Sequence, residues 1–375
     1  MKKIIIILCF LLLMAGCSKT PDPIRSGSMI DAGDIKAPET QKKDALTLLL
    51  ESMTTEEKVG QLFLVAAPNQ DILTQIETYH LGGIILFGDD VEGQTPDSLR
   101  DWIDQIQISS QVPLLVAVDE EGGTVCRISS DSDFRGSRFP SPRKLHNEGG
   151  KELLLSTEEE KCKLLKTLGI NANLAPVCDI TTDSNAFMYQ RSLGLSPEKT
   201  ADCIASMVAV MSDNGIGSVL KHFPGYGNNT DTHVAMAIDD RSLSELECAD
   251  LVPFQGGIDA GCGAIMVSHT IINAMDSQYP ATLSPAVHRY LREDMGFEGV
   301  IITDDMDMDA ITDHYGSDDA AVLAVLAGND ILCTWSYSTQ YEAVLNAVHT
   351  GQISEQQLNS AVLRILTWKH QLGLL

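Results

Sequence analysis

Basic residues are scarce in this 375-residue chain, and their shortage limits the partners it can have. The sequence holds 26 lysines and arginines against 52 aspartates and glutamates, which gives a formal net charge of −26. Because Lys and Arg hold phosphate backbones and anionic lipid surfaces, this balance argues against nucleic acid as the main partner and against a broad basic membrane-binding face. Hydrophobic residues make up 44% and charged residues 21%, which is typical of a folded globular protein.

Cysteine pairs at metal-binding spacing are missing as well. The chain has nine cysteines, and none of them forms a C-x-x-C pair, so a thiolate zinc site is unsupported. Cys9 and Cys17 belong to the N-terminal segment, and the remaining seven are a poor disulfide framework because they are odd in number and widely spread. We expect these seven to be mostly buried small hydrophobic residues: Cys126, Cys162, Cys178, Cys203, Cys248, Cys262 and Cys333.

The N-terminus lacks an apolar run long enough to span a bilayer comfortably. Residues 4–14 are apolar, follow two lysines and lead into Ala15-Gly16-Cys17, a pattern that resembles a bacterial lipoprotein signal. We predict that residues 1–16 are a signal peptide, that Cys17 carries the lipid, and that residues 17–42 form a flexible tether. The protein would then be exported and lipid-anchored to the outer face of the bacterial cell membrane. The alternative is a plain secretory signal with an incidental cysteine.

Eight short apolar runs divide the rest of the chain. Each is rich in Val, Ile and Leu and nearly continuous rather than alternating, which is typical of parallel strands buried on both faces. The segments between them carry helix signals, such as the capping-box patterns of Thr54 with Glu57 and Ser354 with Gln357. Eight strand–helix units predict an α/β fold with a single (β/α)₈ barrel over residues 43–375; an open doubly wound sheet is the alternative. The runs are Gln61–Ala66, Gly82–Phe87, Pro113–Asp119, Asn171–Asp179, Ser218–His222, Ala264–His269, Gly299–Asp304 and Asp330–Trp335.

Ionisable side chains stand at the downstream ends of five of these runs. In a barrel such ends converge on one face, where the active site is built, so the sequence predicts a pocket there. The residues are Asp119, Asp179, Lys221-His222, His269 and Asp304.

The densest of these segments begins at Lys221-His222 and continues through a Gly- and Asn-rich loop to Asp231 and His233. An Asp two residues from a His can hold the imidazole in one tautomer and raise its pKa, which suits a group that gives and later takes a proton. The alternative is an Asx-type turn with a solvent-exposed histidine.

Two further segments carry carboxylates at strand ends. Asp304 ends the apolar run that starts at Gly299 and is followed by Asp305; one of them could be a nucleophile and the other could cap the next helix. A short Gly-rich loop separates Asp119 from Arg127. The two side chains could bind sugar hydroxyls from two sides, or they could simply form an ion pair with each other.

Taken together, these segments resemble family 3 of the glycoside hydrolases, in its β-N-acetylglucosaminidase branch. That branch is marked by a Lys-His-Phe-Pro-Gly strand end followed by Asp-Ser/Thr-His, an Asp-x-Glu-Gly-Gly segment and a Ser/Thr-Asp strand end. Asn173–Asp179 and Gln190–Gly194 also resemble family segments in the same order, so the match covers nearly all of the chain after the tether.

The resemblance implies roles for individual residues. Asp304 matches the catalytic nucleophile, and His233 matches the general acid/base, assisted by Asp231. Five residues match those that bind the non-reducing-end N-acetylglucosamine: Asp119, Arg127, Arg191, Lys221 and His222. The chain departs from the pattern at a few positions, such as Tyr226, where many relatives have His, and the loop from Gly227 to Asp231 is one residue shorter than a common form. These departures leave the loop geometry and the leaving-group preference open.

The sequence thus predicts a retaining exo-β-N-acetylglucosaminidase that works through a glycosyl-enzyme intermediate and needs no metal or organic cofactor. Its predicted partners are N-acetylglucosamine-containing saccharides, with peptidoglycan fragments favoured over chitin, and the membrane only through its anchor. Three alternatives remain at this point. The first is a phosphorylase, because a histidine acid/base leaves the site less anionic than a carboxylate would, so phosphate could replace water. The second is a metal-dependent amidohydrolase, which would need a His-x-His motif at the first strand, where the chain has Val65-Ala66-Ala67. The third is a non-catalytic sugar-binding lipoprotein.

Overall fold

The computed structural model describes residues 39–67, 71–229 and 236–375. The predicted signal peptide, Cys17 and most of the predicted tether lie outside the described residues, as do Asp231 and His233. Residues 43–375 form a compact unit. In the described part of the chain, no helix is both long and apolar enough to cross a membrane.

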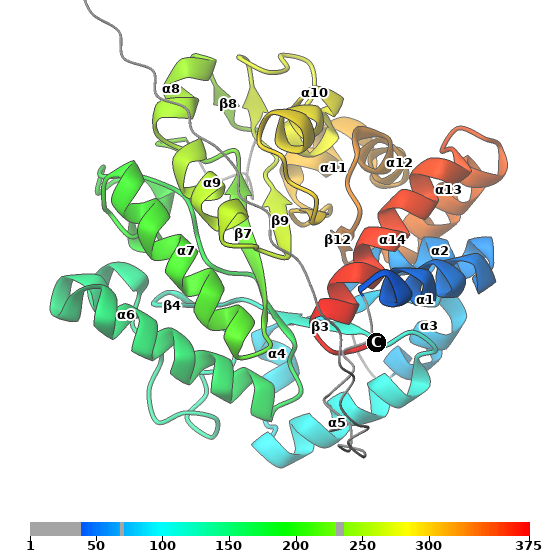
Figure 1. Ribbon diagram of the computed structural model, residues 1–375, viewed down its shortest axis with the longest axis horizontal. Coiled ribbons are helices and arrows are strands. Elements are labelled where there is room, and N and C mark those ends of the chain that lie inside the picture. Colours follow the sequence, from blue (N-terminus) through cyan, green and yellow to red (C-terminus); the bar gives the residue numbers. More distant parts are fainter. Residues whose placement is uncertain (1–38, 68–70, 230–235) are drawn as a thin grey trace, which may run out of the picture. The chain divides into compact units, whose positions relative to one another are not determined.

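A parallel eight-stranded sheet forms the centre of this unit (Figure 1). Neighbouring strands follow each other in chain order, and the first strand pairs with the last, Phe63 opposite Leu332. The remaining gap is closed by a parallel bridge between Ile302 and Ile331, so the sheet is a barrel rather than an open sheet. The prediction of a (β/α)₈ barrel is confirmed. The strands are β1 (Phe63–Ala66), β2 (Gly83–Leu86), β3 (Leu115–Val118), β6 (Ala172–Asn173), β7 (Gly217–Phe223), β9 (Ala264–Val267), β11 (Val300–Thr303) and β12 (Leu332–Thr334).

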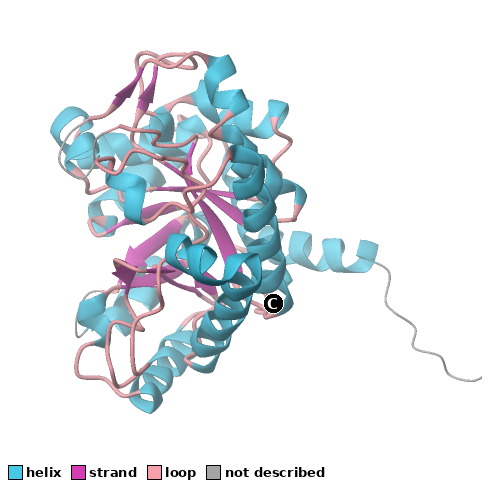
Figure 2. Cartoon of the chain, turned by 90° about the vertical axis from the view of Figure 1, so that its left-hand side faces the viewer, coloured by secondary structure: helices cyan, strands magenta, loops and turns pink. Residues whose placement is uncertain are grey.

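Helices surround the strands on the outside (Figure 2). They are α1 (Glu39–Ser52), α2 (Thr55–Gln61), α3 (Ile72–Tyr79), α4 (Gly88–Val91), α5 (Pro96–Ser109), α6 (Pro142–Thr167), η2 (Phe187–Gln190), α7 (Pro197–Asp213), α8 (Leu243–Cys248), α9 (Leu251–Asp259), η3 (Ala281–Leu283), α10 (Pro285–Arg289), η4 (Tyr290–Asp294), α11 (Asp309–Tyr315), α12 (Ser317–Ala327), α13 (Tyr337–His349) and α14 (Glu355–Gln371).

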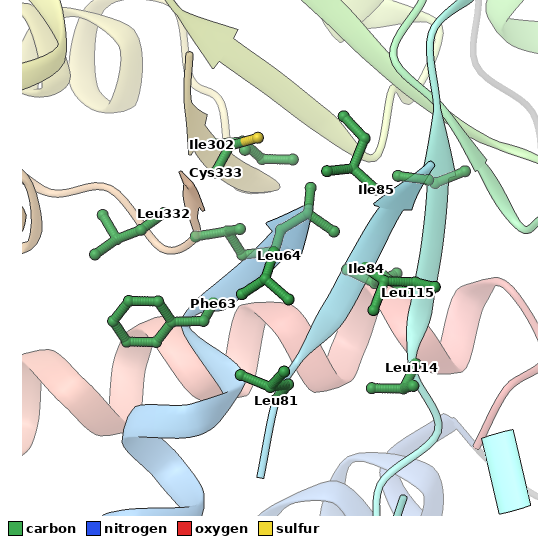
Figure 3. Close-up of a cluster of buried hydrophobic side chains, with 14 of the residues drawn as sticks. Phe63, Leu64, Leu81, Ile84, Ile85, Leu114, Leu115, Ile302, Leu332 and Cys333 are labelled. Atoms are coloured by element: carbon green, nitrogen blue, oxygen red, sulfur yellow. The ribbon is translucent and has the colours of Figure 1, made fainter. Parts of the chain in front are cut away.

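The strands are mostly apolar because both of their faces are buried. All residues of β1, β2, β3, β9 and β11 are buried, and side chains such as Leu64, Ile85 and Leu115 pack together across neighbouring strands (Figure 3). Each such side chain contributes roughly 1.5–3 kcal/mol when it leaves water. This burial explains why the runs are continuous instead of alternating.

Two small sheets were not expected from the apolar runs. An antiparallel pair, β4 (Glu120–Gly122) and β5 (Val125–Cys126), follows β3, and a parallel pair, β8 (Ile238–Asp239) and β10 (Ile271–Ile272), lies farther along the chain. Gly122 at the end of β4 and Gly123 in the turn that follows have positive φ, +105° and +71°. A Cβ on Gly122 would lie 2.4 Å from the carbonyl oxygen of Pro140, so only glycine fits.

Some of the predictions about helix caps and cysteines are confirmed, and others are wrong. The capping box of Thr54 and Glu57 is present, whereas Ser354 caps α14 but the Gln357 side chain donates to the Val325 carbonyl instead. The prediction that Asp304 or Asp305 caps a helix is wrong, because α11 begins at Asp309. Six of the seven cysteines are buried as expected, while Cys248 is exposed; all seven are free thiols.

Candidate active site

A cavity of about 480 Å³ opens at the carboxyl ends of the barrel strands. It collects side chains from the strands and from the loops that follow them, and these segments lie far apart in the sequence. The six predicted site residues that fall in the described part of the chain all line it: Asp119, Arg127, Arg191, Lys221, His222 and Asp304. Of the strand-end residues expected to converge there, Asp119, Lys221, His222 and Asp304 line the cavity, whereas Asp179 and His269 do not.

A buried array of alternating charges forms one side of this site. The Lys221 ammonium lies 2.5 Å from Asp119 Oδ1 and 2.7 Å from Glu121 Oε1. Arg191 donates two hydrogen bonds to the Glu121 carboxylate, at 2.7 and 2.9 Å. Burial alone would raise the pKa of Glu121, but Arg191 and Lys221 hold that pKa well below its usual range. The carboxylate is thus ionised at neutral pH and fixes both cations in place.

The same charges act on the two cations. Burial would lower the pKa of Lys221, yet Asp119 and Glu121 raise it above its ordinary value, so the amine stays charged. Glu121 was given no role by the sequence analysis, although it lies in the Asp-x-Glu-Gly-Gly segment. It is the central member of the array.

His222 is oriented by groups on both sides of its ring. Arg191 Nη2 lies 3.1 Å from His222 Nε2, and because a guanidinium can only donate, Nε2 accepts this hydrogen bond. The ring proton is therefore on Nδ1, which donates to Asp179 Oδ2 at 2.8 Å. Asp179 is buried and also accepts from the backbone N–H groups of His222 and Tyr226. Asp179, noted only as a strand-end residue in the sequence, selects the tautomer of His222.

The hairpin of β4 and β5 positions Arg127. Its backbone N–H donates to Glu120 Oε2 at 2.9 Å, and this buried carboxylate also accepts from the N–H of Ile128 at 2.8 Å. The Arg127 guanidinium lies 3.8 Å from Asp119 and 5.5 Å from the centre of the Phe87 ring. Since Asp119 lies closer to Lys221 than to Arg127, the two residues do not simply form an isolated pair.

Asp304 lies in the cavity wall at the end of β11. Its backbone N–H donates to the Val267 carbonyl at 3.0 Å, and its Oδ1 accepts from the N–H of Asp305 at 2.9 Å. The next peptide carbonyl, that of Asp305, accepts from Nε2 of the buried His269 at 2.8 Å. The strand-end residue His269 thus supports the backbone that carries the carboxylate rather than lining the cavity.

Asp305 also lines the cavity, but its environment differs from that of a solvated carboxylate. Burial raises the pKa of Asp305 to about 6.

Asp231 and His233, to which the family resemblance assigns proton transfer, lie outside the described residues, so their roles stay predictions. Within the described ranges, no group of three or more His, Cys, Asp or Glu residues is arranged to hold a metal ion.

Comparisons with known proteins show which family the chain belongs to. The family model "Glycosyl hydrolase family 3 N terminal domain" matches residues 54–368. Beta-hexosaminidase LpqI of Mycobacterium tuberculosis is 29% identical over 329 residues, which cover 84% of this chain and 83% of LpqI. A protein of Arthroderma benhamiae named "uncharacterized secreted glycosyl hydrolase" is 30% identical over 313 residues, 78% of this chain and 86% of that protein.

Among solved structures, a glycoside hydrolase family 3 beta-N-acetylglucosaminidase from Paenibacillus sp. str. FPU-7 superposes with a TM-score of 0.82 at 31% identity. The superposition covers 86% of this chain and 63% of that one, so the present chain spans less than two thirds of the Paenibacillus protein.

Proposed function

Because the chain belongs to family 3 of the glycosyl hydrolases, we propose that it is a retaining exo-β-N-acetylglucosaminidase. It would remove N-acetylglucosamine from the non-reducing end of β-linked glycans. The names of its relatives, a beta-hexosaminidase and a beta-N-acetylglucosaminidase, support this substrate class.

One structural observation carries the proposal: a fixed array of donors and acceptors and a strand-end carboxylate line the same cavity. Asp119, Lys221 and His222 at the ends of β3 and β7 present acceptors and donors that match sugar hydroxyls, which both give and accept hydrogen bonds. Asp304 enters the cavity from the end of β11, and β11 is separated from β7 by β9 in the barrel. A sugar gripped by the array would then present its anomeric carbon to Asp304.

The proposed reaction has two steps. The Asp304 carboxylate forms a bond to the anomeric carbon while the bond to the leaving oxygen breaks, and that oxygen takes a proton from His233. Neutral His233, held by Asp231, then takes a proton from water, whose oxygen displaces Asp304 and gives the β-anomer again. Histidine here replaces the second carboxylate of the usual scheme, so rules on carboxylate spacing do not apply.

Hydrolysis of an aryl β-N-acetylglucosaminide, compared with the matching β-glucoside, tests the proposal. We expect turnover of the first alone, release of the β-anomer as the initial product, and loss of turnover in Asp304→Asn by several orders of magnitude. An α-anomer would exclude the retaining mechanism. Formation of sugar 1-phosphate when phosphate is added would make the protein a phosphorylase, and absence of any turnover would leave a sugar-binding protein.

The proton-transfer assignment has its own test. We expect Asp231→Ala and His233→Ala to slow hydrolysis non-additively, because the two side chains act as one unit. An aryl leaving group needs little protonation, so its glycosylation step should suffer less than that of a disaccharide. Additive effects of equal size on both substrates would show that another group donates the proton.

We further propose that the enzyme is an exported lipoprotein that trims peptidoglycan fragments. The Ala15-Gly16-Cys17 pattern supports the anchor, and the secreted relative supports export. The mature wild-type chain should begin at Cys17 with a lipid mass attached, and Cys17→Ala should lack it; a mature chain starting elsewhere without lipid would refute the anchor. Faster turnover of muropeptides than of chitin oligosaccharides is the result expected for the cell-wall substrate.

A further inference from the structure

A pair of aromatic rings lies beside the mouth of the cavity. Phe87, which follows β2, lines the cavity, and the ring of Trp335, which follows β12, lies 4.9 Å from it between centroids at an angle of 33°. The strand between these two, β1, ends in Ala66, followed by Ala67. Their small side chains leave room for the two rings to meet across the end of β1.

Trp335 is exposed although it is large and apolar. Its exposed fraction is 45%, and only five large hydrophobic side chains in the described part of the chain are exposed. Tryptophan is enriched at recognition sites, because one flat ring offers a large contact area. The exposed ring beside the mouth of a sugar-sized cavity is therefore suited to contact a bound ligand.

The backbone of Trp335 is held in place by the segment that carries the proposed nucleophile. Asp307, three residues after Asp304, accepts from the N–H groups of Trp335 and Ser336 at 2.6 and 3.0 Å and from the Thr334 hydroxyl at 2.8 Å. The exposed ring thus stands on a rigid support rather than on a loose loop, so little conformational entropy is lost when a ligand covers it.

The position of the rings indicates which part of the substrate they meet, given the proposed function. The array that would hold the non-reducing sugar comes from the ends of β3, β6 and β7, and the carboxylate that attacks the anomeric carbon comes from β11. In the proposed displacement Asp304 attacks one face of this sugar, and the leaving group departs from the opposite face, away from the carboxylate. With the non-reducing sugar in the cavity, the group bonded to its anomeric carbon would extend out through the cavity mouth, beside which Phe87 and Trp335 lie.

We propose that Trp335, resting on Phe87, is the platform on which the sugar of the leaving group packs. One face of a pyranose ring carries mainly C–H groups, which pack well on an aromatic face. This specificity-determining role rests on the proposed function, and it makes the enzyme favour substrates whose leaving group is a sugar over those with a small leaving group.

Kinetics with two leaving groups test the platform. The substrates are N,N′-diacetylchitobiose, whose leaving group is a sugar, and β-N-acetylglucosaminyl azide, whose leaving group is too small to reach the ring. In Trp335→Ala we expect kcat/KM for the disaccharide to fall about tenfold, mostly through KM, and kcat/KM for the azide to stay within twofold. Trp335→Phe keeps a flat ring and should retain most of the disaccharide activity.

The controls separate the possible failures. Ile108→Ala removes another exposed apolar side chain, on α5, and should change kcat/KM for neither substrate. Equal losses for both substrates in Trp335→Ala would show that the ring supports the fold or the first sugar, and no loss for either would show that the platform is unused. Each result overturns the inference. Absence of azide and disaccharide turnover in the wild type would instead contradict the proposed function itself.

Discussion

Asp304 and Asp305 are neighbours in the chain, but the structure gives their carboxylates different surroundings. Asp304 has an oxygen held by the N–H of Asp305, whereas burial raises the pKa of Asp305 to about 6. Two adjacent acids with different environments can take different roles in one site. The sequence Asp-Asp does not reveal that burial raises the pKa of Asp305.

The raised pKa of Asp305 makes a prediction about stability. The folded state binds this proton more tightly than the unfolded chain, so the contribution of Asp305 to stability is present below its ordinary pKa of 3.8 and is lost as the pH rises through about 6. Asp305→Asn should therefore be more stable than the wild type at pH 7, by up to about 3 kcal/mol, and equal to it near pH 3.5. Thermal melts across this range measure the effect.

The exposed Asp313→Asn is the matched control and should leave the pH dependence of Tm unchanged. A constant difference between Asp305→Asn and the wild type from pH 3.5 to 7 would contradict the assignment.

Glu121 is the residue on which the charged array depends. Glu121→Gln keeps the size of the side chain but removes the negative charge between Lys221 and Arg191, which would then repel each other in a buried place. We expect a loss of about 3 kcal/mol in the free energy of unfolding and a fall in kcat/KM of about a hundredfold. Denaturant titration and steady-state kinetics measure both, with the exposed Glu152→Gln as control. Wild-type kinetics in Glu121→Gln would show that the array does not position the sugar.

At the scale of elements, the sequence was informative where burial alone shapes a segment. The eight strands were found because both faces of each are buried, which leaves a continuous apolar run. The hairpin of β4 and β5 was missed because strands of three and two residues show no period. In β4, the Glu120 side chain contacts the Arg127 backbone and the Glu121 side chain contacts Lys221. The sequence Asp119-Glu120-Glu121 alone does not show which carboxylate lies on which face of the strand.

A buried carboxylate joins β11 and β12 at the amino end of the barrel. Asp330 accepts from Arg292 and Arg364 and from the backbone N–H of Ile301. Asp330→Ala leaves two cations without their partner, so we expect the free energy of unfolding to fall by about 3–5 kcal/mol. The active-site cavity lies at the opposite end of the strands, so kcat/KM of the folded fraction should stay within about twofold. A large loss of activity in fully folded protein would contradict this separation.

On the scale of the whole molecule, the amino end of the barrel, opposite the cavity, holds a further buried charge. Lys369 of α14 is fully buried, and its amine lies 2.7 Å from Gln61 Oε1, just before β1. Burial lowers the pKa of Lys369 to about 7. The unfolded chain therefore binds this proton more tightly, and stability is lost as the pH falls from about 10.5 towards 7.

Lys369→Met should accordingly stabilise the protein at pH 7, by an amount on the order of a few kcal/mol, and the gain should shrink as the pH rises toward 10. Denaturant titrations at several pH values measure it, with the exposed Lys163→Met as the matched control. A gain that is the same at pH 7 and pH 10 would mean that hydrophobic packing, not removal of a titrating amine, causes the effect.

The central claim of this account is that Asp304 attacks the anomeric carbon. A slow fluorinated N-acetylglucosaminide should leave its sugar covalently attached to the enzyme, and peptide mass spectrometry then locates it. The account predicts one adduct, on Asp304, and none in Asp304→Asn. An adduct on Asp305 or on any other residue would contradict it.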